Sequence, residues 1–593
     1  MHSPVTCRRA DLSERIAAQQ AVIERFEFAL WNGGFNDAVL ASYQSAWRTL
    51  EALIANCGAD DRHAFVIVIP VADSPGHLRS CLGSLLELCR TFGYGGMHNG
   101  RYQKVVAFIA DDSHEASNIA AHRAIAREFD QLGIATTYFG LEEQVALVDS
   151  FPAVASLSRI IGDASPDAFS HKGQAIMRNL AQLKLAQWYD DAKPILFYTI
   201  DADQSFKVNI PASNGSRNVC ALNFFAQLDA IFSTTDVMLL TGKVVGDPPV
   251  SPAVMAGHFL EDVVGFLREM HDCDPNAPYR QPLARTDRSG DATYHDMADL
   301  FGFPLPTHEY RYRCTLSGEP TNLGCFADFS GRLNRFFHGE HPTRFTWYRP
   351  ENERYSVTPA RTVYTGNTVF RPEALNCFIP FASLRLRMSG PVMGRLLRAA
   401  HGRRFASANL PMLHTRTVET TGQAEFRPGV VLDRERVDLH DEFERQFYGD
   451  VMLFSVERLI KLGFPERNVP SDRVAETLDA VQAEMRQKYL GQRQLVLKEL
   501  GELTALFRRT DAWWRHRPEL AGARAQFDRF IDNIGHNFGE GAIYAACVNP
   551  AHYRRRWRTR QLEAINSYQE DQRAWDQILA TVRQIPVQTC PPR

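Results

Sequence analysis

The stretch "ILFYTIDADQSF", residues 195–206, ends an apolar run in two carboxylates one residue apart, Asp201 and Asp203. Residues 195–200 have the composition of a buried strand, where an ionised aspartate is costly unless it is paired or bound to a metal. Side chains at alternate positions of an extended segment point to one side, so both carboxylates are placed to share one hard cation. Mg²⁺ or Mn²⁺ suits such ligands, with substrate phosphate oxygens completing the shell. The competing interpretation is structural, with Asp201 ending a strand in solvent and Asp203 capping a helix.

The segments around this stretch alternate between strand and helix patterns. "HAFVIVIPVADS" at 63–74 and "KVVAFIADDSHEASN" at 104–118 are β-branched runs that end in polar residues, and "PGHLRSCLGSLLELCR" at 75–90 carries a helical stripe between them. This alternation predicts a right-handed, doubly wound α/β sheet. Ligands of such sheets bind beyond the carboxyl ends of the strands. Both acidic clusters, at 111–112 and 201–203, are predicted to lie there.

Bulk composition is that of a globular protein, with 45% hydrophobic and 23% charged residues in 593. The formal net charge of −3 gives no electrostatic case for nucleic acid as a partner. No stretch approaches the run of about 18 apolar residues that would cross a membrane, and the N-terminus lacks an apolar signal-type core. We therefore expect a cytoplasmic protein without a transmembrane segment.

The length favours several domains. Residues 1–60 have helical patterns and are interpreted as an N-terminal extension, 61–430 as the α/β domain, and 431–593 as a helical C-terminal domain that serves as a scaffold or oligomer surface. The 11 cysteines are scattered and form no Cys-x-x-Cys pair. We expect them to be reduced and mostly buried thiols rather than zinc ligands or disulfides.

In chain order, Pro70 ends the first strand, "DDS" follows the second at 111–113, Lys172-Gly173 precedes a helix, and "DAD" follows a strand at 201–203. This order resembles the GT-A nucleotide-sugar glycosyltransferases, most closely the family 2 type, over roughly residues 62–420. The resemblance implies a GT-A-like doubly wound mixed sheet with helical extensions. It also implies metal-dependent transfer of a sugar, of the hexosyltransferase type, from a nucleotide diphosphate donor to a soluble hydroxyl acceptor.

The resemblance also implies roles for individual residues on the nucleotide side. Pro70, Val71 and Asp73 stand where members of the family contact the nucleoside. Asp112 stands where a carboxylate accepts a hydrogen bond from the base. Lys172 stands where a basic residue approaches the diphosphate.

The resemblance to the family also implies a metal site. Asp201 and Asp203 match the pair that binds the Mn²⁺ or Mg²⁺ and the diphosphate. His414, in "LPMLHTRT" at 410–417, matches a late histidine that completes the metal site. A packed or hydrogen-bonded histidine is the alternative for this residue.

The chain departs from the family at the catalytic base. Where many inverting members carry acids ahead of a helix, residues 389–391 are Ser-Gly-Pro. Either the base lies elsewhere or the enzyme is retaining. Asp247 is a candidate catalytic acid on the acceptor side, and a turn-forming aspartate before two prolines is the alternative. The nearby Arg385 and Arg387 either meet a phosphate or an anionic acceptor, or simply lie on a surface.

Two other functions remain open from the sequence. A nucleotidyltransferase that makes nucleotide sugars would share the sheet and the metal, but "PVADSPGHLRS" after the first strand is poor in glycine. A non-catalytic nucleotide- or sugar-binding scaffold would bind nucleotide without turnover. The missing acids at 389–391 keep this reading open.

Overall fold

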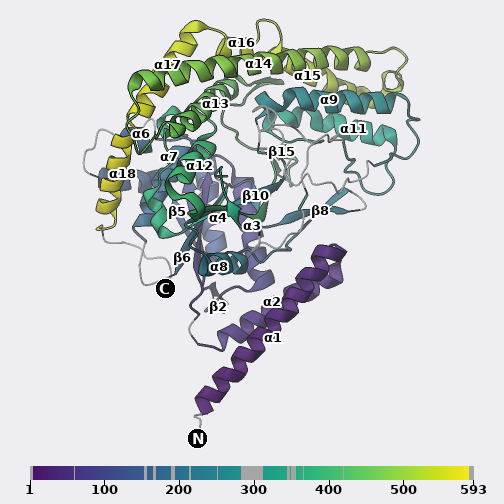
Figure 1. The fold of residues 1–593 in the computed structure, drawn as a ribbon. Coiled ribbons are helices and arrows are strands. Elements are labelled where there is room, and N and C mark those ends of the chain that lie inside the picture. The colour runs from purple at the N-terminus through teal and green to yellow at the C-terminus, as the bar shows by residue number, and fades with distance from the viewer. Residues whose placement is uncertain are drawn as a thin grey trace.

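The computed structural model describes residues 4–58, 60–151, 157–163, 169–188, 194–212, 215–249, 251–281, 312–343, 347–348, 356–364, 366–418 and 420–585. A central sheet occupies the middle of the molecule (Figure 1). A hairpin of two long helices projects at the N-terminal end, and the C-terminal helices lie at the opposite end. The prediction of an α/β fold with helical extensions at both ends is confirmed.

The central sheet is mixed, with β1 at its middle, parallel to both neighbours β4 and β6. β12 is antiparallel to both β6 and β10, and β13 is parallel to β10. The strands in spatial order are β11 (Thr358–Pro359), β13 (Phe405–His414), β10 (Leu239–Gly246), β12 (Asn367–Phe370), β6 (Ile195–Ile200), β1 (Ala64–Val71), β4 (Val105–Asp111) and β5 (Ala135–Phe139), with β7 (Gln204–Ser205) paired to β13.

Helices cover both faces of this sheet, because successive side chains of a buried strand point to opposite sides. Along β1, Phe65, Ile67 and Ile69 join one apolar core, and Val66 and Val68 join another. The first core includes α1 (Pro4–Gly33), α2 (Asp37–Ala55), α3 (Pro75–Phe92), α4 (Ala116–Gln131) and α8 (Phe224–Thr234). The second includes α5 (Leu141–Asp149), α6 (Leu157–Ile161), α7 (Gln174–Ala186), α12 (Ser389–His401) and α18 (Tyr568–Val582).

A third apolar core holds the helical region together, and it is not contiguous in sequence. Helices from the middle of the chain, α9 (Pro252–His271) and α11 (Asn322–Leu333), pack with the C-terminal helices (Figure 1). Those helices are α13 (His440–Lys461), α14 (Ser471–Phe507), α15 (Ala521–Phe538), α16 (Ile543–Val548) and α17 (Ala551–Asn566). The N-terminus of α13 faces the sheet and contributes to the candidate site described below.

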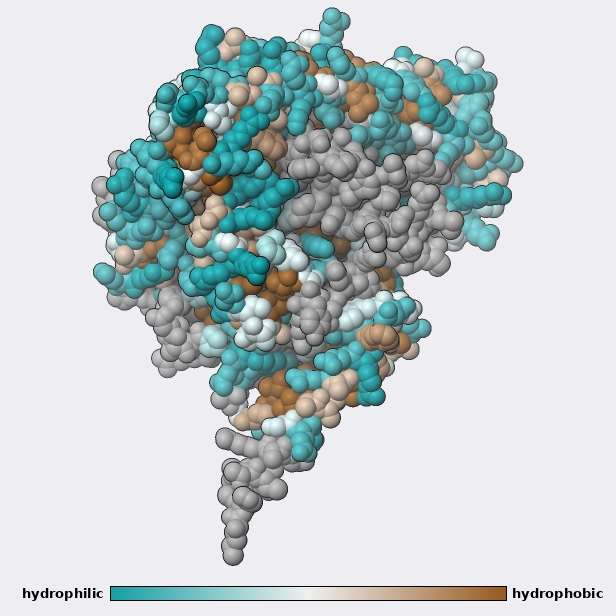
Figure 2. Space-filling view, in the orientation of Figure 1, coloured by the Kyte–Doolittle hydropathy of each residue, from teal (hydrophilic) through white to brown (hydrophobic). Residues whose placement is uncertain are grey.

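Short hairpins lie outside the central sheet. They are β2 (Met97–His98) with β3 (Arg101–Tyr102), β8 (Val208–Ala212) with β9 (Gly215–Val219), β14 (Thr417–Val418) with β15 (Gln423–Ala424), and β16 (Val431–Asp433) with β17 (Arg436–Asp438). The visible surface is mainly hydrophilic, with smaller hydrophobic patches (Figure 2). Among the described helices, none combines the length and hydropathy needed to cross a membrane.

The cysteines correct one expectation. Cys314 and Cys325 form a disulfide that ties the segment before α11 to that helix. Cys57, Cys81, Cys89, Cys220, Cys273, Cys377 and Cys547 are free, and four of them, Cys81, Cys89, Cys220 and Cys547, are buried. The pairing was not predicted because a spacing of 11 residues without a Cys-x-x-Cys motif gives no local signal.

Candidate functional site

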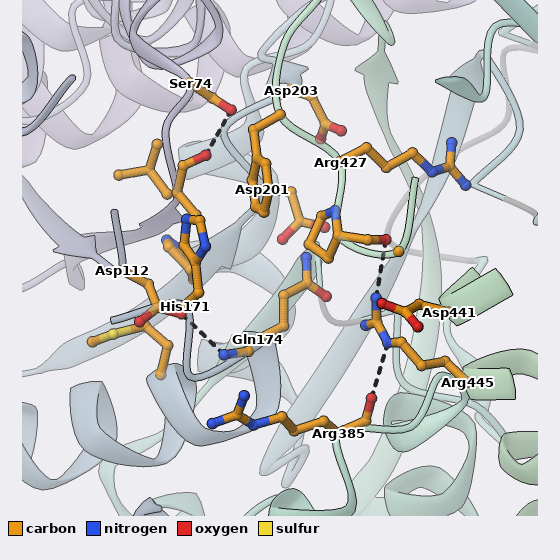
Figure 3. Close-up of a pocket in the computed structure, with 18 of the residues that line it drawn as sticks. Ser74, Asp112, His171, Gln174, Asp201, Asp203, Arg385, Arg427, Asp441 and Arg445 are labelled. Atoms are coloured by element: carbon orange, nitrogen blue, oxygen red, sulfur yellow. Dashed lines mark hydrogen bonds between the residues drawn. The ribbon is translucent and has the colours of Figure 1, made fainter. Parts of the chain in front are cut away.

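The carboxyl ends of β1, β4 and β6 open into a cavity of about 550 Å³. Its far wall comes from the segment 425–429 and from α13 and α17. Figure 3 shows acidic and basic side chains from these elements facing one another across the cavity. The sequence-predicted residues that line it are Pro70, Val71, Asp112, Asp201, Asp203 and Arg385.

The two acids after β4 have different surroundings. Both carboxylate oxygens of Asp111 are engaged in hydrogen bonds within the protein. They accept from the amide and hydroxyl of Ser113, from His122 and from Tyr138. Asp112 instead lines the cavity. Asp111 therefore supports the turn that presents Asp112.

Asp112 also organises the turn before α7. Its carboxylate accepts from the amides of Lys172 and Gly173, both at 3.0 Å, and lies 2.8 Å from the Lys172 ammonium. Lys172 is 2% exposed, and its Nζ also donates to the Phe169 carbonyl. Burial lowers the pKa of Lys172, and the Asp112 charge opposes this effect. The predicted nucleotide residues Asp112 and Lys172 are thus each other's partners.

Asp73 contacts a histidine at the rim of the cavity. Its carboxylate accepts from the amides of His114 and Glu115 and contacts Nε2 of His171 at 2.5 Å. The His171 ring stacks on Phe426, with ring centroids 4.5 Å apart. His171 and Phe426 both line the cavity, and neither was identified from the sequence.

Each aspartate of the Asp-x-Asp pair forms an ion pair with an arginine. Arg178, from α7, bonds to Asp201, and Nη1 of Arg416 lies 2.5 Å from Asp203. The side chains of Asp201 and Asp203 are 24% and 15% exposed. Oδ1 of Asp203 has no hydrogen-bond partner among the described residues. The pair is therefore cavity-facing and charge-compensated, and one buried oxygen remains available to a ligand.

The pKa values of the two carboxyls are shifted in opposite directions. Burial raises the pKa of Asp201, and the Asp203 charge adds to this although Arg178 opposes it. Burial has the same effect on Asp203, but Arg416 and His414 outweigh it and hold its pKa well below the usual range. Asp203 is therefore the carboxylate that keeps its charge most firmly.

His414 lies beside this pair at the end of β13. Its Nδ1 is 2.5 Å from the Asp247 carbonyl, which can only accept, so Nδ1 carries the proton. Its Nε2 points at Asp203, 3.3 Å from Oδ2. A carbonyl behind one ring nitrogen is the arrangement that orients a histidine for metal through the other. Asp201, Asp203 and His414 together offer a donor set of two carboxylates and one imidazole that fits Mn²⁺.

A second group of possible ligands lies on the opposite wall. His440, Asp441 and Glu444 have ligand atoms within 4.8 Å of one another. Tyr553 and Trp557 both donate to Glu444, and Nε2 of His440 is 3.3 Å from the Tyr553 hydroxyl. These hydrogen bonds account for the positions of His440 and Glu444.

Asp247 lies behind His414 and lines a different cavity, of about 870 Å³, together with Glu340 and Trp347. Its carboxylate accepts from the Arg416 amide at 2.9 Å. Burial raises the pKa of Asp247 to about 6, and the Glu340 charge adds to this shift. The structure thus places Asp247 beside the predicted metal ligands but on the other side of His414 from the nucleotide cavity.

Comparison with known proteins found similarity only among solved structures. No protein-family model matches the chain, and no curated protein sequence matches it. Among solved structures, it is similar to a mannosyltransferase from Pyrobaculum calidifontis in complex with GDP-Man and Mn²⁺, with 10% identity, a TM-score of 0.30, and coverage of 96% of this chain and 98% of that one.

Two further structures are similar over less of the chain. One is TarS 1–349 of S. aureus, with 11% identity and a TM-score of 0.25 over 81% of this chain and 92% of that one. The other is mouse xyloside xylosyltransferase 1, with 14% identity and a TM-score of 0.18 over 37% of this chain and 62% of that one. At these values the similarities assign neither a family nor an activity to this chain.

Proposed function

We propose that this chain is a metal-dependent GT-A glycosyltransferase that moves a sugar from a nucleotide diphosphate donor to a soluble hydroxyl acceptor. The observation that carries the proposal is the convergence of Asp201, Asp203 and His414 at the edge of a cavity that also contains Asp112. Carboxylates at the carboxyl ends of parallel strands, beside a cavity that would hold a small organic molecule, are typical of nucleotide sites.

In this proposal the nucleoside lies against Pro70 and Val71, and Asp112 accepts from its base. Asp73 acts indirectly, by holding His171 at the rim. Lys172 acts through Asp112, to which it is bonded. These residues fix the orientation of the donor before any chemistry occurs.

Asp201, Asp203 and His414 would hold Mn²⁺ or Mg²⁺. When bound, such a cation offsets the charge that develops on a departing diphosphate. Arg178 bonds to the Asp201 carboxylate, and Gly366 leaves room for that carboxylate, since a Cβ at Gly366 would collide with it. We keep Asp247 as the candidate catalytic acid, and its buried carboxyl faces the larger cavity behind His414.

Calorimetric titration of nucleoside diphosphates and nucleotide sugars, first with Mn²⁺ and then with EDTA, tests the proposal. We expect one nucleotide to bind in a metal-dependent way. Asp203→Ala should abolish that dependence and leave the fold intact, whereas Asp433→Ala, at an exposed position of β16, should change nothing. Absence of binding by the folded wild-type protein would refute the proposal.

Release of nucleotide from the donor separates transfer from binding alone. A glycosyltransferase releases nucleoside diphosphate when acceptor is added, whereas a binding scaffold holds the nucleotide without turnover. A nucleotidyltransferase would instead release pyrophosphate from a nucleoside triphosphate and a sugar phosphate.

A further inference from the structure

A smaller cavity, of about 230 Å³, adjoins the Asp-x-Asp pair on the side of α12. Asp201 is its acidic lining residue, and Ser389 and Gly390 at the start of α12 form part of its wall. The basic residues that line it are Lys172, Arg385, Arg387, Arg416, Arg427 and Arg445. This is the position at which the sequence has Ser-Gly-Pro in place of acids.

Some of these cations have acidic partners. Lys172 pairs with Asp112 and Arg416 with Asp203. Arg387 and Arg427 share one carboxylate, that of Glu442, which is fully buried. One acid therefore compensates two guanidinium groups.

Arg385 and Arg445 add further positive charge. Arg445 donates to the backbone carbonyls of Arg385 and Pro428, at 2.9 and 3.0 Å. Within the described part of the chain, the Arg385 guanidinium forms no ion pair. Figure 3 shows both side chains among those that line the nucleotide cavity, with Arg445 bonded to the backbone carbonyl of Arg385. The walls thus carry more positive than negative charge.

The excess of positive charge contributes to lowered pKa values of two arginines in this wall. Burial lowers the pKa of Arg427 to about 9, and the Arg416 charge adds to the shift. Burial also lowers the pKa of Arg445, with Arg387 and Arg385 acting in the same direction although Glu442 opposes them. Arg427 is buried, Arg445 is partly buried and Arg385 is exposed. Like charges held close together are unfavourable, and a bound anion relieves the repulsion.

The backbone of the segment that presents Arg385 has an unusual conformation and is closely packed. Arg385 and Met388 both have positive φ, at 53° and 66°. The amide of Arg387 donates to the Arg445 carbonyl, and a Cβ at Gly449 would lie 2.5 Å from the Arg387 carbonyl oxygen. Backbone strain fixed by close packing in this way concentrates at functional sites.

We propose that the acceptor is an anionic hydroxyl compound whose carboxylate or phosphate binds Arg385 and Arg445 in this cavity. The inference rests on the proposed function and deepens it, since it names the acceptor class. Arginine suits this role because its planar fork matches a carboxylate or phosphate with two hydrogen bonds. The nucleotide cavity and the arginine cavity are contiguous and share Asp201, Arg385 and Arg445 in their linings, so the acceptor anion would lie next to the donor site.

The first test is binding of anions without metal. Inorganic phosphate and lactate are titrated calorimetrically into the wild-type protein in EDTA, where no metal-bound site contributes. We expect Arg385→Gln to weaken binding of the preferred anion about tenfold or more, as loss of a charge-assisted hydrogen bond implies. Arg403→Gln, at an exposed position, and Asp203→Ala should both retain it. Equal affinity in wild type and Arg385→Gln would overturn the inference.

The second test uses acceptors in charged and uncharged pairs. Nucleotide release from the donor is measured with lactate against propane-1,2-diol, and with glycerol phosphate against glycerol. We expect only the charged member of a pair to accelerate release, and the pair that responds identifies a carboxylate or a phosphate. Arg385→Gln should raise the half-saturating acceptor concentration about tenfold and leave donor affinity unchanged.

The outcomes separate this inference from the function on which it rests. If Arg385→Gln weakens donor binding instead of acceptor binding, the arginines serve the donor and the inference is wrong. If Arg385-dependent phosphate binding is present but no nucleotide binds with Mn²⁺, the proposed transfer is wrong and the acceptor assignment falls with it. Preference for uncharged acceptors would also overturn the inference.

Discussion

A single methyl group at Gly366 tests whether the position of Asp201 matters. Gly366 precedes β12, which pairs with β6, so its Cα lies against the end of the strand that carries Asp201. A Cβ there would lie 2.4 Å from Oδ2 of Asp201 and 2.7 Å from Nε2 of Gln204. An ordinary van der Waals contact begins at 3.4 Å, so the carboxylate must retreat by about 1 Å (3.4 − 2.4).

Asp201 cannot make this movement without losing contacts. Its other oxygen is bonded to Arg178, and its amide donates to the Gln204 side chain. A displacement of about 1 Å in a catalytic group can lower a rate by about 100-fold. We expect Gly366→Ala to lower the rate of nucleotide release by that factor and to weaken metal-dependent nucleotide binding. Overpacking should cost about 1–3 kcal/mol in unfolding free energy.

The assay pairs calorimetry and release rates with a matched control. Gly265→Ala makes the same chemical change within α9, where no atom lies within 4 Å of the added Cβ. That variant should keep full activity and gain up to about 1 kcal/mol of stability. A folded Gly366→Ala protein with wild-type rate and metal affinity would refute the assignment of Asp201.

Three further predictions follow from buried charges. Burial raises the pKa of Asp450 to about 7 from 3.8, so the native state retains a proton that the unfolded chain has lost. The unfolding free energy should therefore fall by about 2 kcal/mol between pH 5 and pH 7, and urea unfolding of Asp450→Asn should lack this contribution. Asp112→Asn presents an NH₂ group to backbone amides, so it should weaken nucleotide binding about tenfold with or without metal; unchanged affinity in the titration would contradict its role. Glu442→Gln leaves the buried Arg427 and the partly buried Arg387 uncompensated and should cost about 3–5 kcal/mol by urea unfolding, whereas Glu435→Gln, on the surface, should be neutral.

The sequence predicted those features that depend on local pattern. β-branched runs located β1, β4 and β6, because a strand buried on both faces must be apolar throughout. The acids after two of these strands placed the site at one edge of the sheet, since parallel strands end together. The antiparallel insertion of β12 between β10 and β6 was not predicted, because strand pairing is set by distant residues.

The partners of the predicted residues were missed for a related reason. Arg178 lies within an ordinary amphipathic helix, and nothing in its neighbours distinguishes an arginine that binds Asp201 from one in solvent. Arg416 lies 213 residues from its partner Asp203. Its position two residues after His414, at a strand end, was the one available signal. Ion pairs between distant segments require the fold before they can be recognised.

The pairing of each site carboxylate with an arginine has a consequence for the order of binding. Arg178 and Arg416 compensate the charges of Asp201 and Asp203 without a cation. If a dication alone took both carboxylates, the two guanidinium groups would lose their partners inside a partly buried cavity, which is costly. A dication that arrives with a diphosphate also brings the anion that these arginines can bind. Mn²⁺ and nucleotide should therefore bind cooperatively, each tightening the other by the same factor. Titration of Mn²⁺ in the absence and presence of nucleoside diphosphate measures that factor, and equal Mn²⁺ affinity in both would show that the arginines do not compete for the carboxylates.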